Sequence, residues 1–380
     1  MKKTFLTLLT TVALLGTGEV KAANGVLQVK GTLKNFGDSA LVFIHTPGEA
    51  GTRKDTVLLK DGKFSFSLKI NKVSDVEFVS PDVVRGAKGK YLTFIAVPNE
   101  TMELNGDANE SFTITGSKFY KEFREIDLAV ESAQKELDDF IRSLNTRMEK
   151  GESQEVLMKE YEEKSPILKA KVTNASIDFI KKHPGYEANV YTIAQLHELE
   201  EMEAAVKLLA PAVREGRMKP YYEVRLNQLR EKKESEERAA KMQAAGVEAP
   251  NFTLNDLNGQ PLSLSSLRGK YVILDFWGSW CGWCIKGFPK MKEYYAKYKG
   301  KFEILGIDCN DPLEKWKEAV KKHELPWLHV YNTKESKVLS EYAIQGFPTK
   351  IVIGPDGKIV KTVVGEDPAF YTLLDELFGK

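Results

Sequence analysis

Two cysteines with two residues between them carry the clearest chemistry in this 380-residue chain. They lie in the run Trp280-Cys281-Gly282-Trp283-Cys284, and side chains three residues apart share one face of a helix, so their sulfurs can form a disulfide. At the first turn of a helix, unpaired N–H groups and the positive dipole end favour a Cys281 thiolate. We therefore expect Cys281 to attack a partner's disulfide and Cys284 to resolve the mixed disulfide.

The same pair has two other interpretations, a permanent structural disulfide and half of a zinc site. Tetrahedral zinc needs four ligands, whereas the chain has three cysteines in all and five histidines that are distant from the pair in sequence. The third cysteine, Cys309, follows a predicted strand, and we expect a buried thiol there, with a regulatory or intermolecular bond as the alternative. The sequence predicts no metal and no cofactor.

Alternating strands and helices are predicted around the pair, from Ala249-Pro250 onward. Residues 271–277 form a nearly continuous apolar run, typical of a strand buried on both faces, and Asp275 is its one charge. This strand leads into the cysteine pair, where a helix should begin. Further strands are expected over 302–308, 351–353 and 359–364, with a helix capped by Asp311-Pro312. Residues 247–380 are thus predicted to form an α/β layer domain.

This segment resembles the thioredoxin superfamily, and more closely the exported thiol-disulfide oxidoreductases of the TlpA and ResA type. The motifs that carry the resemblance are Ala249-Pro250-Asn251-Phe252, Ser266-Leu267-Arg268-Gly269-Lys270, Leu274-Asp275-Phe276-Trp277, Trp280-Cys281-Gly282-Trp283-Cys284, Pro289 and Gly346-Phe347-Pro348-Thr349. The resemblance covers about a third of the chain and implies a mixed central sheet with flanking helices.

The resemblance also assigns roles around the sulfurs. It implies that Pro348 is a cis-proline facing the redox pair, which leaves the backbone of Phe347 free to pair with a substrate strand. It implies that Asp275 assists proton transfer to the inner sulfur, and burial in an apolar strand should raise the pKa of that carboxyl. Trp280 and Trp283 are expected to form an apolar rim that suits partner docking.

Two positions depart from the family pattern. Many TlpA and ResA relatives carry Glu where this chain has Gly287, so one acidic group near the thiols is missing. Trp283 precedes the inner sulfur, where thioredoxin itself has Pro. The redox potential therefore does not follow from the resemblance.

The rest of the chain is predicted to form two zones. Residues 24–116 alternate apolar and polar side chains with turns such as Asp61-Gly62, which predicts an antiparallel β-sandwich-like domain. Residues 117–246 have helical periodicity, with breaks expected at Gly151, Pro166, Pro184-Gly185, Pro211 and Pro220, and a charged last helix that suits a bridge between domains. Both zones look like the β-rich module of unknown role in exported proteins of Bacteroidetes-type bacteria.

Residues 1–23 are interpreted as a cleaved signal peptide. A basic start precedes a mostly apolar run of about eleven residues, shorter than the roughly 20 that a membrane helix needs, and small residues follow. No Cys stands near the cleavage site to carry a lipid. We therefore expect a periplasmic protein that is not a lipoprotein. The 55 basic and 54 acidic residues give no long-range attraction to nucleic acid.

These features favour a disulfide reductase of other exported proteins, supplied with electrons by a membrane or periplasmic thiol donor. The alternatives are a scaffold or binding protein with a regulatory redox domain, a thiol peroxidase, and a copper chaperone. A peroxidatic Pro-x-x-x-Thr-x-x-Cys motif is absent, and copper chaperones of this fold space their sulfurs by three residues and add a His.

Overall fold

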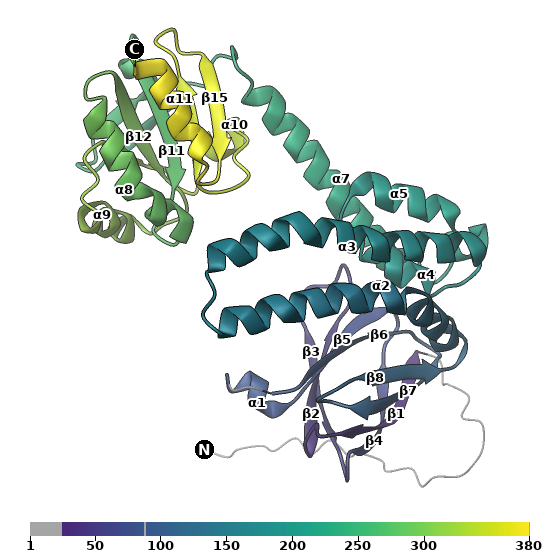
Figure 1. Ribbon diagram of the computed structural model, residues 1–380. Helices are drawn as coiled ribbons and strands as arrows, with labels where there is room; N and C mark the ends of the chain where they lie inside the picture. The colour runs from purple at the N-terminus through teal and green to yellow at the C-terminus, as the bar shows by residue number, and fades with distance from the viewer. Residues whose placement is uncertain (1–24, 87–88, 380) are drawn as a thin grey trace, which may run out of the picture. The chain divides into compact units, whose positions relative to one another are not determined.

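The computed structural model describes residues 25–86 and 89–379 (Figure 1). The predicted signal peptide, residues 1–23, lies outside them. Across these described ranges, every helix is too short or too polar to span a bilayer. The chain divides into two compact units, Met1–Arg230 and Glu231–Lys380.

The first unit contains two four-stranded sheets. Their strands alternate buried and exposed side chains, and Leu27, Val29 and Val42 belong to one core shared by both sheets. One sheet has the order β4-β1-β7-β8 and the other β3-β2-β5-β6, and every pairing is antiparallel except β1 with β7. The strands are β1 Val26–Lys34, β2 Ser39–His45, β3 Arg53–Leu58, β4 Lys63–Lys69, β5 Ser74–Val79, β6 Tyr91–Ala96, β7 Thr101–Asp107 and β8 Phe112–Gly116, with α1 Pro81–Val84 after β5.

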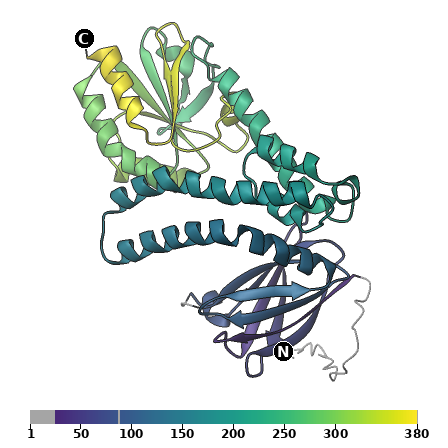
Figure 2. The same ribbon diagram turned by 45° about the vertical axis from the view of Figure 1, so that its right-hand side comes forward.

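Helices follow directly after β8. They are α2 Lys118–Glu149, α3 Gln154–Lys182, α4 Asn189–Ala194, α5 Leu199–Leu208, α6 Pro211–Arg214 and α7 Lys219–Met242. α2 and α3 run side by side as an antiparallel pair in both views (Figure 1, Figure 2), and α7 continues across the boundary between the units. The predicted break at Pro166 is wrong, because α3 passes through it. Pro166 is exposed, so water can hydrate the carbonyl that loses its helical partner.

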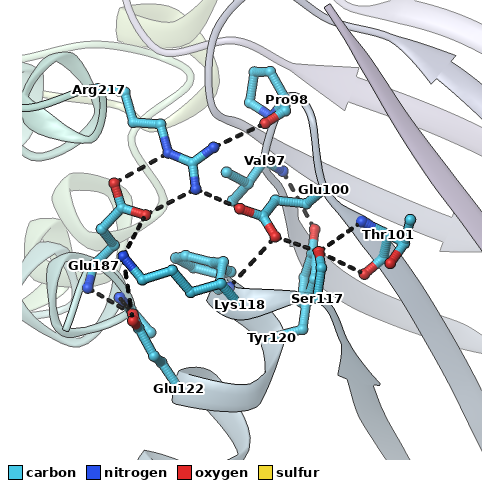
Figure 3. Close-up of polar contacts among 12 residues, drawn as sticks. Val97, Pro98, Glu100, Thr101, Ser117, Lys118, Tyr120, Glu122, Glu187 and Arg217 are labelled. Carbon is cyan, nitrogen blue, oxygen red and sulfur yellow. Dashed lines mark hydrogen bonds and ion pairs between the residues drawn. The ribbon is translucent and has the colours of Figure 1, made fainter. Parts of the chain in front are cut away.

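A charged network joins the helical segment to the sheets within the first unit. Figure 3 shows the Arg217 guanidinium between Glu100, which follows β6, and Glu187, which precedes α4. Glu100 is 5% exposed and also accepts a hydrogen bond from Ser117 Oγ just before α2. A buried carboxylate needs such partners, so Arg217 stabilises the docking of the helices on the sheets.

The second unit is built on a mixed seven-stranded sheet of order β10-β9-β13-β12-β11-β14-β15. Helices cover both faces, which confirms the predicted α/β class. The elements are β9 Thr253–Asp256, β10 Pro261–Ser263, the 3-10 turn η1 Leu264–Leu267, β11 Tyr271–Trp277, α8 Gly282–Lys297, β12 Phe302–Asp308, α9 Leu313–Lys322, β13 Leu328–Tyr331, α10 Val338–Glu341, β14 Thr349–Ile353, β15 Ile359–Val364 and α11 Pro368–Phe378.

The two faces of β11 pack against different layers. Ile273 and Trp277 join the cluster that includes residues of α8, α9 and α11, whereas Val272, Leu274 and Phe276 join the cluster on the opposite face. Because side chains alternate along a strand, Asp275 points to the same face as Ile273 and Trp277. That face is also the one that α8, the helix carrying the cysteines, covers.

Candidate active site

The cysteine pair lies where the central strand β11 ends and α8 begins. β11 pairs with β12 on one side and with β14 on the other, so its end is held from both sides. Gly278 follows the strand, and a Cβ there would stand 2.5 Å from Trp280 Nε1 and 2.9 Å from the Cys309 carbonyl oxygen. Only glycine lets the chain turn this tightly into the helix.

Cys281 and Cys284 are joined by a disulfide, with their Cα atoms 5.3 Å apart. Cys281 is the N-cap residue of α8, and its sulfur accepts a hydrogen bond from the Cys284 backbone N–H at 3.2 Å. The exposed fractions are 6% for Cys281 and 2% for Cys284. In the reduced form, the same N–H group and the helix dipole would stabilise a thiolate on Cys281.

Two exposed tryptophans belong to the cysteine motif, Trp280 before Cys281 and Trp283 between the two cysteines. Trp280 is 54% exposed and Trp283 63% exposed. The Trp280 indole N–H donates to the Cys309 carbonyl at 2.9 Å, and its ring meets Phe347 edge to face at 5.3 Å between centroids. Trp283 lies under Lys286, whose Nζ is 4.8 Å from the ring centroid. Trp280 therefore links the cysteine loop to the loop that carries Phe347 and Pro348.

The Phe347–Pro348 peptide bond is cis. Pro348 is buried, and its carbonyl accepts a hydrogen bond from the Gly365 N–H at 2.7 Å. Within the described ranges, the backbone of Phe347 makes no hydrogen bond, and its side chain is half-buried. Its backbone N–H and C=O are thus available to a strand from another chain.

Asp275 is 1% exposed, and its Oδ2 atom has no hydrogen-bond partner. Burial raises its pKa to about 6, while Lys350 acts to lower it and Glu366 acts to raise it. A carboxyl group with this pKa exchanges its proton near neutral pH. The structure places it on the sheet face covered by α8, in the layer of both cysteines.

The sequence analysis did not predict the role of several polar groups at or after the ends of β11 and β12. Asp311, expected only to cap a helix, accepts hydrogen bonds from the Ser279 N–H at 2.6 Å and the Ser279 hydroxyl at 2.7 Å. It thereby holds the loop before Cys281. Burial, with the Asp311 charge nearby, raises the pKa of Asp308 to about 8.

Lys350 and Glu366 are two further residues near the site that the sequence analysis did not predict. Lys350 is 1% exposed, lies opposite Asp275 on β14, and binds Glu366 at 2.8 Å. The sequence did contain a signal for this ion pair. Lys350 stands directly before the apolar strand residues Ile351-Val352-Ile353, and a lysine buried in such a strand requires a buried anion as its partner.

Cys309 is fully buried and is not part of a disulfide. Its thiol donates to the Ile307 carbonyl at 3.4 Å, and burial raises its pKa far above the usual range. It is therefore a poor nucleophile. In the part of the chain that the structure covers, no three His, Cys, Asp or Glu side chains group as metal ligands would.

Two families match the sequence. Residues 245–362 match the AhpC/TSA family, and residues 27–123 match a domain of unknown function, DUF4369. The first match contains both cysteines, Asp275 and Pro348. The second spans the strands β1 to β8, except Val26 at the start of β1, and the start of α2.

The sequence is also similar to thiol-disulfide oxidoreductases of Bacillus species. The thiol-disulfide oxidoreductase ResA of Bacillus cereus (strain ZK / E33L) is 42% identical over 122 residues, which are 32% of this chain and 70% of the relative. ResA of Bacillus subtilis (strain 168) is 38% identical over 121 residues, 32% of this chain and 67% of the relative.

Among solved structures, the thioredoxin domain of a thiol-disulfide oxidoreductase from Bacteroides vulgatus is 36% identical. That match covers 35% of this chain and 98% of the other, with a TM-score of 0.33. A thiol:disulfide interchange protein from a Bacteroides species is 35% identical and covers 37% and 93%, with a TM-score of 0.34.

Proposed function

This chain belongs to the thioredoxin-like thiol-disulfide oxidoreductases of the ResA type, and from that premise we propose that it reduces disulfide bonds in other exported proteins. The observation that carries the proposal is the Cys281–Cys284 disulfide at the start of α8, with the sulfur of Cys281 at the N-cap.

The proposed reaction begins from the reduced pair. The Cys281 thiolate attacks one sulfur of the substrate disulfide, which breaks that bond and forms a mixed disulfide. The other substrate sulfur leaves as a thiolate in this first step. The Cys284 thiolate then attacks the Sγ atom of Cys281, which breaks the mixed disulfide, releases the substrate sulfur bound there and re-forms the internal disulfide. Two electrons pass to the substrate, whose two sulfurs take up two protons. A membrane or periplasmic dithiol donor then reduces the pair again.

Asp275 is proposed to take the proton from Cys284 during resolution. Its pKa of about 6 leaves it mostly ionised, and so able to accept a proton, at neutral pH. A normally solvated carboxylate would be a much weaker base. No other protein group hydrogen bonds to its Oδ2 atom within the described ranges.

Substrate binding is proposed at the rim of the disulfide. Trp280 and Trp283, which precede and follow Cys281 in the chain, offer exposed apolar surface. The free backbone of Phe347, set by the cis peptide to Pro348, can pair with an extended substrate segment. Main-chain pairing would place a substrate cystine beside the sulfurs with little dependence on sequence.

Export and domain division are further parts of the proposal. Residues 1–23 have the composition of a cleaved signal peptide, and a periplasmic location would expose the pair to disulfide-containing clients. The domains proposed are 24–116, 117–246 and 247–380. The first two would form an accessory module, for which the DUF4369 match gives no activity.

Reduction of insulin with a dithiol donor tests the proposal. We expect Cys281→Ser to abolish turnover, because the attacking thiolate is gone. Cys309→Ser is the matched control and should keep full turnover, since that thiol is buried outside the disulfide. Undiminished turnover by the Cys281→Ser variant would rule the proposal out.

The direction of electron flow has its own test. A reductase should have a potential nearer to the roughly −270 mV of thioredoxin than to the roughly −120 mV of DsbA. Equilibration of the full chain with a glutathione series measures it. A value near the DsbA end would make the protein an oxidant.

A scaffold whose redox domain only regulates the first unit is the second candidate, and the separate match of residues 27–123 favours it. Deletion of residues 24–245 discriminates between the two. Full complementation in vivo by the remaining chain with its export signal would argue against the scaffold.

A further inference from the structure

We propose that Glu366 is a positioning residue of the redox site, which holds the Lys350 ammonium in an ion pair and so keeps Asp275 free to take up and return a proton. This inference rests on the role proposed above for Asp275. It adds a residue that lies outside every motif of the cysteine site and follows β15 in the chain.

The argument starts from one buried cation between two carboxylates. Lys350 is 1% exposed, and its Cα partner across the β11–β14 pairing is Asp275. Side chains directly opposite on neighbouring strands lie about 5 Å apart at Cβ, so Lys350 is within reach of Asp275. The Lys350 Nζ atom instead binds Glu366 Oε2 at 2.8 Å.

Because Lys350 binds Glu366, the Asp275 carboxyl has no ion-pair partner among the described residues. Its Oδ2 atom has no hydrogen-bond partner, although a lysine stands opposite. If Lys350 paired with Asp275, the carboxylate would be held in its charged form, because an opposite charge within about 4 to 6 Å lowers a carboxyl pKa by about 1 to 3 units. The Glu366 ion pair prevents this.

Glu366 is itself held in place from two further elements. The Tyr371 hydroxyl of α11 donates to Glu366 Oε1 at 2.6 Å. A Cβ at Gly287 of α8 would stand 2.3 Å from Glu366 Oε2, so the carboxylate occupies the space that any side chain at position 287 would take. Gly287 lies three residues after Cys284, on the helix that carries both sulfurs.

This packing accounts for the glycine at position 287. The Glu366 carboxylate, from the segment after β15, fills the space that a side chain at this position would take. The glycine is therefore required by the position of Glu366. The residues at positions 287 and 366 therefore depend on each other, because only a glycine at 287 leaves room for the Glu366 carboxylate.

The charged and titratable groups that face Asp275 come from each element packed on it. Lys350 on β14 and Glu366 after β15 act on its charge directly. Asp275 in turn acts on Tyr371 of α11 and on Cys309 after β12, and burial keeps both of those groups neutral. Cys284 on α8 is the thiol it would serve. Among these groups, Lys350 is the single cation, so its partner decides the state of Asp275.

The test is a titration of the Asp275 carboxyl by carbon-13 NMR in the full chain, as wild type and as Glu366→Gln. The glutamine keeps the size and an acceptor for Tyr371 but removes the charge that holds Lys350. We expect the pKa of Asp275 to fall by about one unit or more as Lys350 turns to it. An unchanged titration would overturn the proposal.

Lys350→Met is the opposing variant and covers the case in which Glu366→Gln does not fold. Removing the cation should raise the pKa of Asp275, since burial and the Glu366 charge then act unopposed. A fall, or no change, in this variant would also overturn the proposal.

The rate of mixed-disulfide resolution as a function of pH links the titration to function. Its inflection should move with the pKa of Asp275 in Glu366→Gln, and Glu366→Asp should restore it in part. In the Asp275→Asn background, Glu366→Gln should shift nothing, and a persisting shift would refute action through Asp275. If the Asp275 titration moves as expected while Asp275→Asn resolves at the wild-type rate, the function proposed for Asp275 fails and the Glu366 ion pair stands.

Discussion

Replacement of Asp275 by asparagine should stabilise the second unit, and only above a defined pH. The wild-type carboxyl is buried, and its pKa of about 6 lies above its ordinary value of 3.8. The folded state therefore binds this proton more tightly than the unfolded state does. Stability of the wild type falls as the pH rises from about 4 to about 6, because the carboxyl must then ionise inside the core.

The size of the effect follows from the two pKa values. They differ by roughly two units, and each unit corresponds to about 1.4 kcal/mol, so ionisation costs the fold about 3 kcal/mol at pH 8. Asparagine cannot ionise and escapes this cost. A buried amide without partners has a cost of its own, about 1 to 3 kcal/mol, but that cost does not change with pH. The change in the difference between variant and wild type, from pH 4 to pH 8, isolates the ionisation.

Tryptophan fluorescence reports this unit alone, since the five tryptophans of the chain lie between positions 277 and 327. Urea unfolding of the oxidised full chain at several pH values gives the free energy of unfolding of wild type and variant. We expect the variant's advantage to grow by about 2.5 kcal/mol between pH 4 and pH 8, because a small part of the cost is already present at pH 4. A difference that stays flat with pH would refute the raised pKa and, with it, the proton-transfer role.

Two further predictions concern other surfaces. Arg217→Met should destabilise the first unit by about 2 kcal/mol, because it leaves the buried Glu100 carboxylate without its cation, while Arg217 itself is partly exposed. The control Arg142→Met removes an exposed ion pair and should change the stability little. Hydrogen exchange by mass spectrometry measures both variants, and equal effects would contradict a stabilising role of the Arg217 network. Trp283→Ala should raise KM for a protein disulfide about tenfold and leave KM for a small aromatic disulfide unchanged, because the exposed ring would contact only the larger substrate. An equal rise in KM for both substrates would contradict a role of Trp283 in docking.

The sequence predicted best where hydrophobic pattern and spacing act locally. β11 and β12 have the predicted bounds, because a mostly apolar run of this length has few other ways to bury itself. The predicted helix break at Pro166 is wrong because the effect of a proline depends on whether it is exposed, which the sequence pattern does not show. Proline costs a helix less where water can hydrate the freed carbonyl, and Pro166 is exposed, so α3 can continue through it.

The candidate site could be predicted only in its local part. Cys281 and Cys284 are three residues apart, and their relation to the helix start is contained in that spacing. The pairing of Lys350 with Glu366, and the approach of Glu366 to Gly287, join residues from three elements whose packing no local pattern reports. Asp311 was interpreted as a helix cap because it precedes Pro312, but its carboxylate binds Ser279 instead. Such contacts join residues that are distant in sequence, so they depend on how the strands and helices pack in the folded protein.

Trapping the mixed disulfide tests the central claim most directly. In a Cys284→Ser variant, the resolving thiol is missing, so attack on a disulfide-containing peptide should stop at a covalent adduct. Mass spectrometry after proteolysis locates it. The account predicts one adduct, on Cys281, which dithiothreitol releases. An adduct on Cys309, or none at all in the presence of excess peptide, would contradict it.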